Sequence, residues 1–351
     1  MTARRGVALT PMETRRDVII RTAVLADELG YETFGLPEGW GLDPGPVLTE
    51  IALRTTRIRL VSSIFSVWGR TPATLAMTAA TLHQVSGGRY VLGLGASTRA
   101  LVEGFHGVAF DHPAARLRDV VAQVRVLLNG EPAQLGQIGG FGPAVAARPL
   151  RLGQPPVPEL PIWVAALGPH TIRVAAELGD GWIPALVARD RLPGWAAQLR
   201  RHRDTAGPQS RPFTVAAGPL VVVDEDPGPA RAIAATGIAW YLSAMGDVYA
   251  RSVSGQGYAD EVKAIIAANE RPSPRHGTVP PEAQAVLDQL AAYGPAGQVR
   301  EQLELWDDAA DIVTIMLPPG LPWPTIEATL RAAAPAVRAA VGACRGPGRP
   351  G

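Results

Sequence analysis

The stretch Ser86-Gly-Gly-Arg-Tyr-Val-Leu-Gly-Leu-Gly95 decides the fold that this sequence predicts. It follows an apolar helical pattern over residues 71–85, turns at its first two glycines, and continues into an apolar run with two more glycines near its end. A helix that passes through a tight glycine turn into a continuous apolar strand is typical of a parallel sheet covered by helices. In such folds the loops that leave the carboxyl ends of the strands carry the chemistry.

The same alternation of helix and strand runs along the chain. Residues 15–29 carry apolar side chains at helical spacing and end at Gly30, which suits a helix C-cap. Eight segments have the composition of buried strands, and each is followed by helical material: residues 6–10, 33–36, 58–64, 90–95, 162–166, 181–183, 213–223 and 312–317. Eight such units predict a closed (β/α)8 TIM barrel, because an open doubly wound sheet usually has fewer strands.

Two stretches interrupt this pattern, and we interpret both as insertions. Gly and Pro dominate at about residues 130–160, which suggests hairpins or loop over one end of the sheet. Broken helices and a Pro-rich segment mark the second insertion, at about residues 245–282, before helical patterns over 284–293 and 296–307. We therefore predict one barrel domain over residues 1–342, followed by a disordered tail over residues 343–351.

The composition of the chain argues against several classes of function. The 351 residues carry 33 basic and 32 acidic side chains, so the chain lacks the basic excess that nucleic-acid binding needs. Cys344 is the single cysteine and no histidine pair has ligand spacing, so we expect no metal site. No stretch approaches the roughly 20 apolar residues of a membrane span, and no signal peptide is apparent. We expect a cytoplasmic protein that acts on a small molecule, away from membranes.

Polar and aromatic side chains follow the predicted strands and would surround one mouth of the barrel. A carboxylate, small hydroxyls, tryptophans and a glycine turn suit a flat conjugated ring between apolar walls better than a bare metal ion. These candidate residues are Glu38, Trp40, Ser63, Ile64, Trp68, Ser97, Thr98, Leu167, Gly168, Pro169 and Thr171.

Several of these residues also have a purely structural interpretation. Glu38 either serves the reaction or caps the segment that follows it. Trp40 and Trp68 either contact the ring or the substrate, or pack at the rim. Ser97 and Thr98 either contact a cofactor or cap a helix that begins close behind them.

Four segments together resemble the bacterial-luciferase-like superfamily of flavin and deazaflavin oxidoreductases. They are residues 25–38, 60–76 with its Arg70-Thr-Pro-Ala-Thr-Leu-Ala76 run, 79–95 with its Ser-Gly-Gly-Arg turn, and 161–182. The last segment, with Ala-Leu-Gly-Pro followed by Gly-Asp-Gly, resembles the branch that uses the deazaflavin coenzyme F420. The resemblance covers about residues 5–320.

This resemblance implies a TIM barrel with the ring lying across the strand ends. It implies a non-proline cis peptide bond at Ser63–Ile64 that forms a bulge behind the ring. It also implies a homodimer, and a coenzyme tail held near the loops that carry Ser97, Gly168, Pro169 and Thr171.

The segment after Glu38 departs from the pattern of one branch. In the sugar-phosphate dehydrogenases of this superfamily, the corresponding acid is followed by a catalytic histidine, whereas Gly39 follows Glu38 here. That specific dehydrogenation is therefore not expected. Glu38 remains the best candidate for a general acid or base, and the alternative is that it only orients the substrate.

The coenzyme decides the chemistry, and the protein positions it. A deazaflavin has carbon in place of the oxygen-reactive ring nitrogen, so it transfers hydride and forms no peroxide adduct. We therefore expect hydride transfer between coenzyme F420 and a small organic substrate, such as an imine, an enone or a methylene-pterin-like carbon. Two alternatives stay open: a monooxygenase that uses reduced FMN and oxygen, and a non-catalytic barrel without a cofactor.

Overall fold

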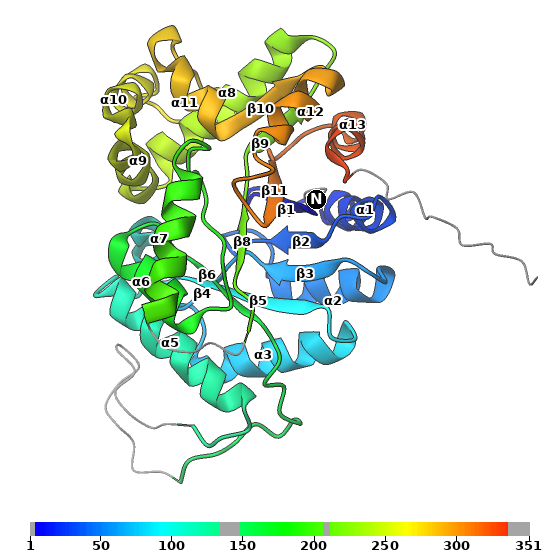
Figure 1. The fold of residues 1–351 in the computed structure, drawn as a ribbon, viewed down its shortest axis with the longest axis vertical. Coiled ribbons are helices and arrows are strands. Elements are labelled where there is room, and N and C mark those ends of the chain that lie inside the picture. The colour runs from blue at the N-terminus through cyan, green and yellow to red at the C-terminus, as the bar shows by residue number, and fades with distance from the viewer. Residues whose placement is uncertain (1–3, 134–147, 206–210, 336–351) are drawn as a thin grey trace, which may run out of the picture.

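Eight parallel strands close into a barrel in the computed structural model of this chain, which describes residues 4–133, 148–205 and 211–335 (Figure 1). The first and last strands pair in parallel, from Arg4 opposite Ile312 to Leu9 opposite Leu317. The predicted (β/α)8 TIM barrel is confirmed. Its strands are β1 (Arg4–Leu9), β2 (Thr33–Leu36), β3 (Arg59–Ser62), β5 (Tyr90–Gly95), β6 (Ile162–Ala165), β7 (Gly181–Trp182), β8 (Thr214–Ala217) and β11 (Ile312–Leu317).

Helices cover the outside of the barrel, and their apolar faces pack with the strands into one large buried cluster. Inside the barrel, alternate strand residues form a smaller cluster around Trp163, which is 2% exposed. The covering helices are α1 (Arg16–Glu28), α2 (Pro44–Arg54), α3 (Pro72–Val85), α5 (Pro113–Leu128), α6 (Pro169–Leu178), α7 (Leu192–Thr205), α12 (Ala296–Glu304) and α13 (Trp323–Ala333), with the short α4 (Arg99–Gly104) after β5.

The contact between β3 and β5 depends on a glycine. A Cβ atom at Gly93 would lie 1.8 Å from the backbone carbonyl oxygen of Ser62, so no side chain fits there. The Ser62 hydroxyl, fully buried, accepts from the Gly93 N–H at 2.9 Å and donates to the Gly93 carbonyl at 3.1 Å. A Cβ atom at Gly95 would likewise lie 2.9 Å from Ile64. Gly93 and Gly95, which lie in the stretch that predicts the fold, therefore leave the space that the end of β3 occupies against β5.

The segment 213–223, predicted as one strand, is two strands, β8 and β9 (Leu220–Val223). The break lies at Gly218 and Pro219. A Cβ atom at Gly218 would lie 2.4 Å from the Thr314 carbonyl, and proline has no N–H to donate to a ladder. The chain there passes close to β11, which pairs first with β8 and then, at Met316, with β9.

The predicted helix over 284–293 is also shorter than expected. Its helical part, α11 (Gln284–Leu290), follows a 3-10 turn over Pro281–Ala283 and gives way to β10 (Ala291–Gly294). β10 pairs in parallel with β9, about seventy residues earlier in the chain. Such long-range pairing overrides the helix propensity of the alanines.

A helical layer lies over one end of the barrel, at the top of Figure 1. It contains α8 (Pro227–Ala244), α9 (Asp247–Val253), a π-turn (Ser254–Tyr258) and α10 (Ala259–Ala268), together with α11. This layer has its own buried apolar cluster and includes the insertion predicted at about 245–282. Much of the other predicted insertion, and the predicted tail over 343–351, lie outside the described residues.

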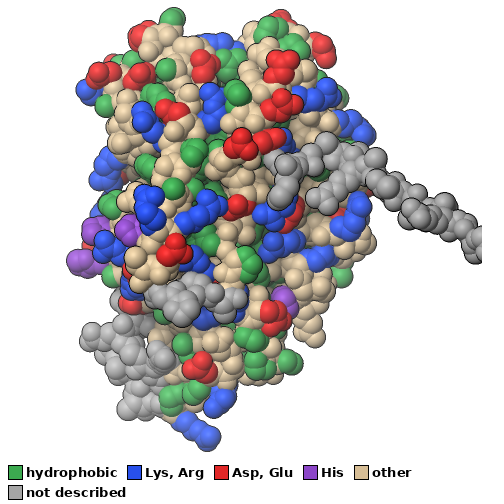
Figure 2. Space-filling model, viewed as in Figure 1, with side chains coloured by type: hydrophobic (Ala, Val, Ile, Leu, Met, Phe, Trp, Pro, Cys, Tyr) green, Lys and Arg blue, Asp and Glu red, His purple; other side chains and the backbone are tan. Residues whose placement is uncertain are grey.

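The distribution of charged side chains on the surface agrees with the nearly equal numbers of basic and acidic residues in the sequence. Basic and acidic side chains are interspersed on the face shown in Figure 2. Within the part of the chain that the structure describes, no helix is long and apolar enough to cross a bilayer. Over the same residues, no three metal-ligating side chains lie together.

Gly93→Ala is expected to abolish folding or to lower the free energy of unfolding by more than about 3 kcal/mol, because the new methyl group would overlap backbone rather than a movable side chain. The matched control is Gly104→Ala, at a helical position where a Cβ atom meets nothing within 4 Å. That control should be neutral or slightly stabilising. Urea unfolding followed by far-UV circular dichroism measures both, and wild-type stability of Gly93→Ala would refute the packing constraint.

Candidate active site

A cavity opens at the carboxyl ends of the barrel strands, and we call it the mouth. Its lower walls come from the ends of β1, β2, β3, β8 and β11, and from the loops that follow β2, β3 and β5. Its upper wall comes from α4, the loop after β7, and the α8–α9 region. The mouth therefore lies between the barrel and the helical layer, where TIM-barrel enzymes carry their active sites.

Five of the residues predicted from the sequence line this one cavity. They come from three different loops, after β2, β3 and β5, so the barrel brings together side chains that lie up to sixty residues apart in the chain. They are Glu38, Ser63, Ile64, Ser97 and Thr98.

The peptide bond between Ser63 and Ile64 is cis, as the resemblance implies. The bulge is tied to the preceding loop because Ser63 N–H donates to the Leu36 carbonyl at 2.9 Å and Glu38 N–H donates to the Ile64 carbonyl at 3.1 Å. Gly35 lies beneath it, where a Cβ atom would come within 2.7 Å of the Ser63 hydroxyl. Backbone and small side chains therefore form this side of the mouth.

Both carboxylate oxygens of Glu38 are already engaged by protein donors. Arg70 donates to Oε1 from Nε at 2.9 Å and from Nη2 at 2.7 Å, and Ser66 N–H donates to Oε2 at 2.7 Å. Burial works to lower the pKa of the Arg70 guanidinium, but the carboxylates of Glu38 and Asp43 outweigh it and raise that pKa. The ion pair is mostly buried and joins the loop after β2 to the segment between β4 (Phe65–Ser66) and α3.

Ser97 and Thr98, the two hydroxyl residues after β5, lie where both a helix-capping role and a role in the site are open to them. Ser97 has a φ of 60°, a left-handed conformation that turns the chain away from the strand. Thr98 caps α4, since its hydroxyl accepts from the Leu101 N–H at 3.5 Å, a long hydrogen bond. Both also line the mouth.

The two predicted tryptophans do not line the mouth. Trp68 is 4% exposed, and its indole N–H donates to the Ala96 carbonyl at 2.8 Å while its ring packs against Phe110. It thus fastens the loop after β4 to the loop after β5. Trp40 is 40% exposed and is not part of the lining of the mouth. For both residues, the structure favours packing or rim positions over contact with a ring.

The loop after β6, which is the fifth strand of the barrel, also does not line the mouth. Gly168 is the N-cap residue of α6, and Thr171 closes the turn by accepting from the Gly168 N–H at 3.2 Å and donating to its carbonyl at 3.0 Å. Pro169 begins the helix, and Leu167 is half-buried against the main core. Their contact with a coenzyme tail stays a prediction.

Two tyrosines in the upper wall of the mouth were missed at the level of sequence. Tyr241 and Tyr249 meet edge to face, with ring centroids 5.2 Å apart. Neither hydroxyl has a hydrogen-bond partner among the described residues. Burial raises the pKa of Tyr249 to about 12, and burial together with Tyr249 raises that of Tyr241. Tyr241 lies on α8 and Tyr249 on α9, beyond the turn at Gly246, so no helical spacing in the sequence brings the two rings together.

Comparison with known proteins places this geometry in a family. Residues 1–311 match the family described as luciferase-like monooxygenase. The chain is 31% identical over 323 residues to a putative coenzyme F420-dependent oxidoreductase of Mycobacterium tuberculosis, covering 83% of this chain and 87% of that protein. It is 30% identical over 205 residues to 5,10-methylenetetrahydromethanopterin reductase of Archaeoglobus fulgidus, covering 56% of this chain and 57% of that one.

Solved structures share the fold. The coenzyme F420-dependent tetrahydromethanopterin reductase from Methanopyrus kandleri matches with a TM-score of 0.72 at 20% identity, covering 95% of this chain and 98% of that one. The FMN-bound oxygenating constituent of 3,6-diketocamphane monooxygenase from Pseudomonas putida matches with a TM-score of 0.65 at 18% identity, covering 95% and 97%. This chain belongs to the luciferase-like monooxygenase family and is an oxidoreductase.

Proposed function

We propose that this protein transfers a hydride between coenzyme F420 and a carbon atom of a small organic substrate. The observation that carries the proposal is the cavity at the strand ends, where residues from three loops, Glu38, Ser63, Ile64, Ser97 and Thr98, line one mouth. The choice of coenzyme is supported by the relative that is named as F420-dependent and matches most of this chain. Bound at the mouth, the deazaflavin would supply the hydride chemistry.

The residues of the mouth fit a flat heterocycle with polar groups at its edges. Gly35 and the Ser63–Ile64 backbone leave a side-chain-poor surface on one side, while Val61 and Met316 are apolar. The buried hydroxyl of Thr314 has no hydrogen-bond partner within the described residues. A mostly apolar cavity with a few convergent polar groups is the usual form of a cofactor site.

Glu38 acts as a positioning residue in this proposal. Its carboxylate holds Ser66 N–H and the Arg70 guanidinium, and so fixes the segment that follows the cis bond. A carboxylate with three protein donors is a poor source of a proton. Its contacts therefore favour orientation over the general acid or base role expected from sequence.

The phenol groups of Tyr241 and Tyr249 are the available hydrogen-bond donors, because neither hydroxyl is bonded to another described residue. Burial raises both pKa values, so the two phenols stay neutral and serve as hydrogen-bond donors. A hydroxyl that donates to the oxygen or nitrogen of an unsaturated substrate would stabilise the charge that develops there as the carbon is reduced. The reacting group that this upper wall suits is an uncharged carbonyl or imine, since the apolar side chains Leu101, Leu186 and Met245 line the mouth together with the tyrosines.

The second candidate function is FMN-dependent monooxygenation, favoured by the family description and by the FMN-bound structural neighbour. The two candidates differ in the coenzyme that the mouth accepts. Titration of the purified protein with each coenzyme, followed by fluorescence quenching, tests them directly. We expect F420 to bind with a Kd on the order of micromolar or tighter and FMN at least about tenfold more weakly.

Tighter binding of FMN, with oxygen uptake supported by reduced FMN, would replace the proposed function by the second candidate. Binding of neither coenzyme would reject both and leave the non-catalytic barrel. A screen of carbonyl, imine and enone acceptors with reduced F420 then identifies the substrate class.

The positional role of Glu38 predicts that Glu38→Gln and Arg70→Gln lower kcat to a similar extent, roughly tenfold, without removing an ionisation from the pH–rate profile. The surface pair Arg118–Glu177 supplies matched controls, Arg118→Gln and Glu177→Gln, which should be neutral. A general acid or base would behave differently: Glu38→Gln alone would cost about 100-fold or more and would remove one limb of the profile. Stopped-flow kinetics across pH separate the two outcomes.

The donor role of the tyrosines predicts that Tyr249→Phe lowers kcat about 10- to 100-fold with little change in coenzyme affinity, because only the hydroxyl is lost. Tyr241→Phe retains the edge-to-face ring pair and should have a smaller effect, since Tyr241 is the more buried of the two. Ultraviolet titration of tyrosinate in the coenzyme-free protein gives an independent readout: the group that ionises near pH 12 should be absent from Tyr249→Phe. Unchanged kcat in both variants would exclude the tyrosines as donors.

A further inference from the structure

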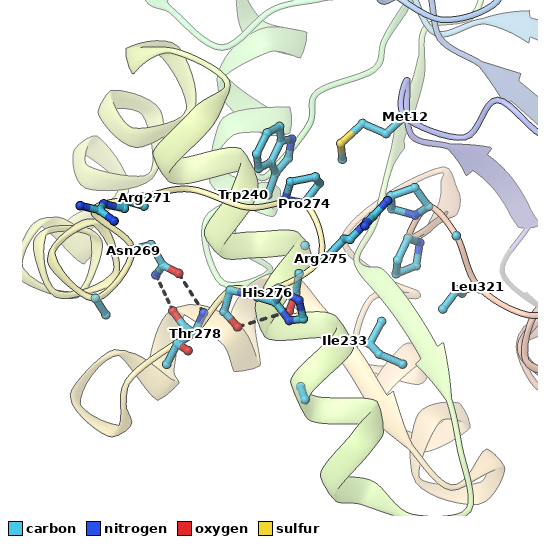
Figure 3. Close-up of a pocket in the computed structure, with 18 of the residues that line it drawn as sticks. Met12, Ile233, Trp240, Asn269, Arg271, Pro274, Arg275, His276, Thr278 and Leu321 are labelled. Carbon is cyan, nitrogen blue, oxygen red and sulfur yellow. Dashed lines mark hydrogen bonds between the residues drawn. The ribbon is translucent and has the colours of Figure 1, made fainter.

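A second and larger cavity, which we call the outer groove, lies beside the mouth (Figure 3). It runs between α8, the segment that follows α10, and the loop between β11 and α13. Its volume is about 1110 Å³. This exceeds the range of about 300–1,000 Å³ that is usual for ligand pockets.

The mouth and the outer groove share their dividing wall. On α8, Tyr241 lines the mouth and Trp240 lines the groove. After β1, Pro11 lines the mouth and Met12 the groove. The end of β11 divides in the same way, with Met316 on one side and Pro318 on the other. The mouth encloses about 180 Å³, less than is usual for a ligand pocket, so a coenzyme ring and a substrate held there together must extend beyond its rim.

The loop between Asn269 and Thr278 forms the far wall of the groove. Asn269 joins the two ends of this loop, because its side-chain amide donates to the Thr278 carbonyl at 2.8 Å and accepts from the Thr278 N–H at 3.0 Å (Figure 3). The Thr236 hydroxyl on α8 accepts from the Gly277 N–H at 3.2 Å, and a Cβ atom at Gly277 would lie 3.0 Å from Ala239. These contacts give the loop a defined position against α8.

The lining combines apolar side chains with charged ones, which are Glu270, Arg271 and Arg275. Ile233 and Trp240 on one side, and Leu321 on the other, supply apolar surface. Figure 3 shows Arg275 extending into the groove, toward the β11–α13 side. Among the described residues Arg275 forms no ion pair, so its guanidinium is available to an anionic ligand. The indole N–H of Trp240 is buried without a partner over the same part of the chain.

We propose that the outer groove binds an amphipathic organic anion, with an apolar chain along α8 and an acidic group at Arg275. The guanidinium would pair with a carboxylate through two N–H donors, a geometry that arginine favours. Insofar as the ligand is the distal part of the substrate whose reacting carbon enters the mouth, the inference rests on the proposed function. The groove itself is a separate binding site with its own test.

Dodecanoate is a suitable probe, and isothermal titration calorimetry on the coenzyme-free protein measures its binding. We expect Arg275→Gln to weaken binding about 5- to 20-fold and to reduce its salt dependence. Ala232→Trp fills the groove from an exposed position on α8 and should abolish binding. Arg300→Gln, at an exposed arginine outside the groove, is the matched control and should leave binding unchanged. Dodecanol, which lacks the charge, should bind at least about 5-fold more weakly than dodecanoate.

Absence of dodecanoate binding, equal binding of dodecanol, or unchanged affinity in both Arg275→Gln and Ala232→Trp would each overturn the proposal. Urea unfolding checks that both variants retain the fold. F420 titration of the same variants separates this inference from the proposed function. If the protein binds F420 but not dodecanoate, the proposed function stands and the groove proposal fails. If it binds dodecanoate but not F420, only the groove proposal is supported.

Discussion

The close backbone contact between β3 and β5 is the constraint on which the rest of the structure depends. The Ser62 carbonyl occupies the place where any side chain at position 93 would begin, and the Ser62 hydroxyl bonds both backbone groups of Gly93. The strand can therefore end in a bulge at Ser63–Ile64 that faces the mouth while β4 still pairs with β5. Without this contact, the side-chain-poor surface at the mouth has no support.

Polar contacts between loops fix one side of the mouth, and the helical layer covers the other side. Glu38 and Arg70 connect the loops after β2 and β3, and Trp68 connects the segment after β4 to the loop after β5. The helical layer closes the upper side with Tyr241 and Tyr249. The strand ends and their loops thus form one side of the mouth, and the helical layer forms the other.

Much of the barrel was predictable from sequence, because each of its eight strands is an apolar run between helix signals. Glu38, Ser63 and Ser97 could be placed at one mouth for the same reason: carboxyl ends of parallel strands share an edge. The β9–β10 pair was not predictable, since it depends on pairing between segments about seventy residues apart. For Trp68 the sequence left packing and ring contact as alternatives, because it shows which loop a side chain occupies but not whether its indole N–H finds a backbone carbonyl, as it does at Ala96. The tyrosines were missed because they lie on two helices, α8 and α9, and only the turn at Gly246 brings their rings together.

The central claim is that a flat redox heterocycle lies at the mouth against the Ser63–Ile64 backbone. An experimental structure of the protein with coenzyme F420 bound tests it most directly. We expect the tricyclic ring in van der Waals contact with Ile64, with its other face turned toward Tyr241 and Tyr249. A ring bound outside the mouth, or one that leaves the Ser63–Ile64 segment uncovered, would contradict it.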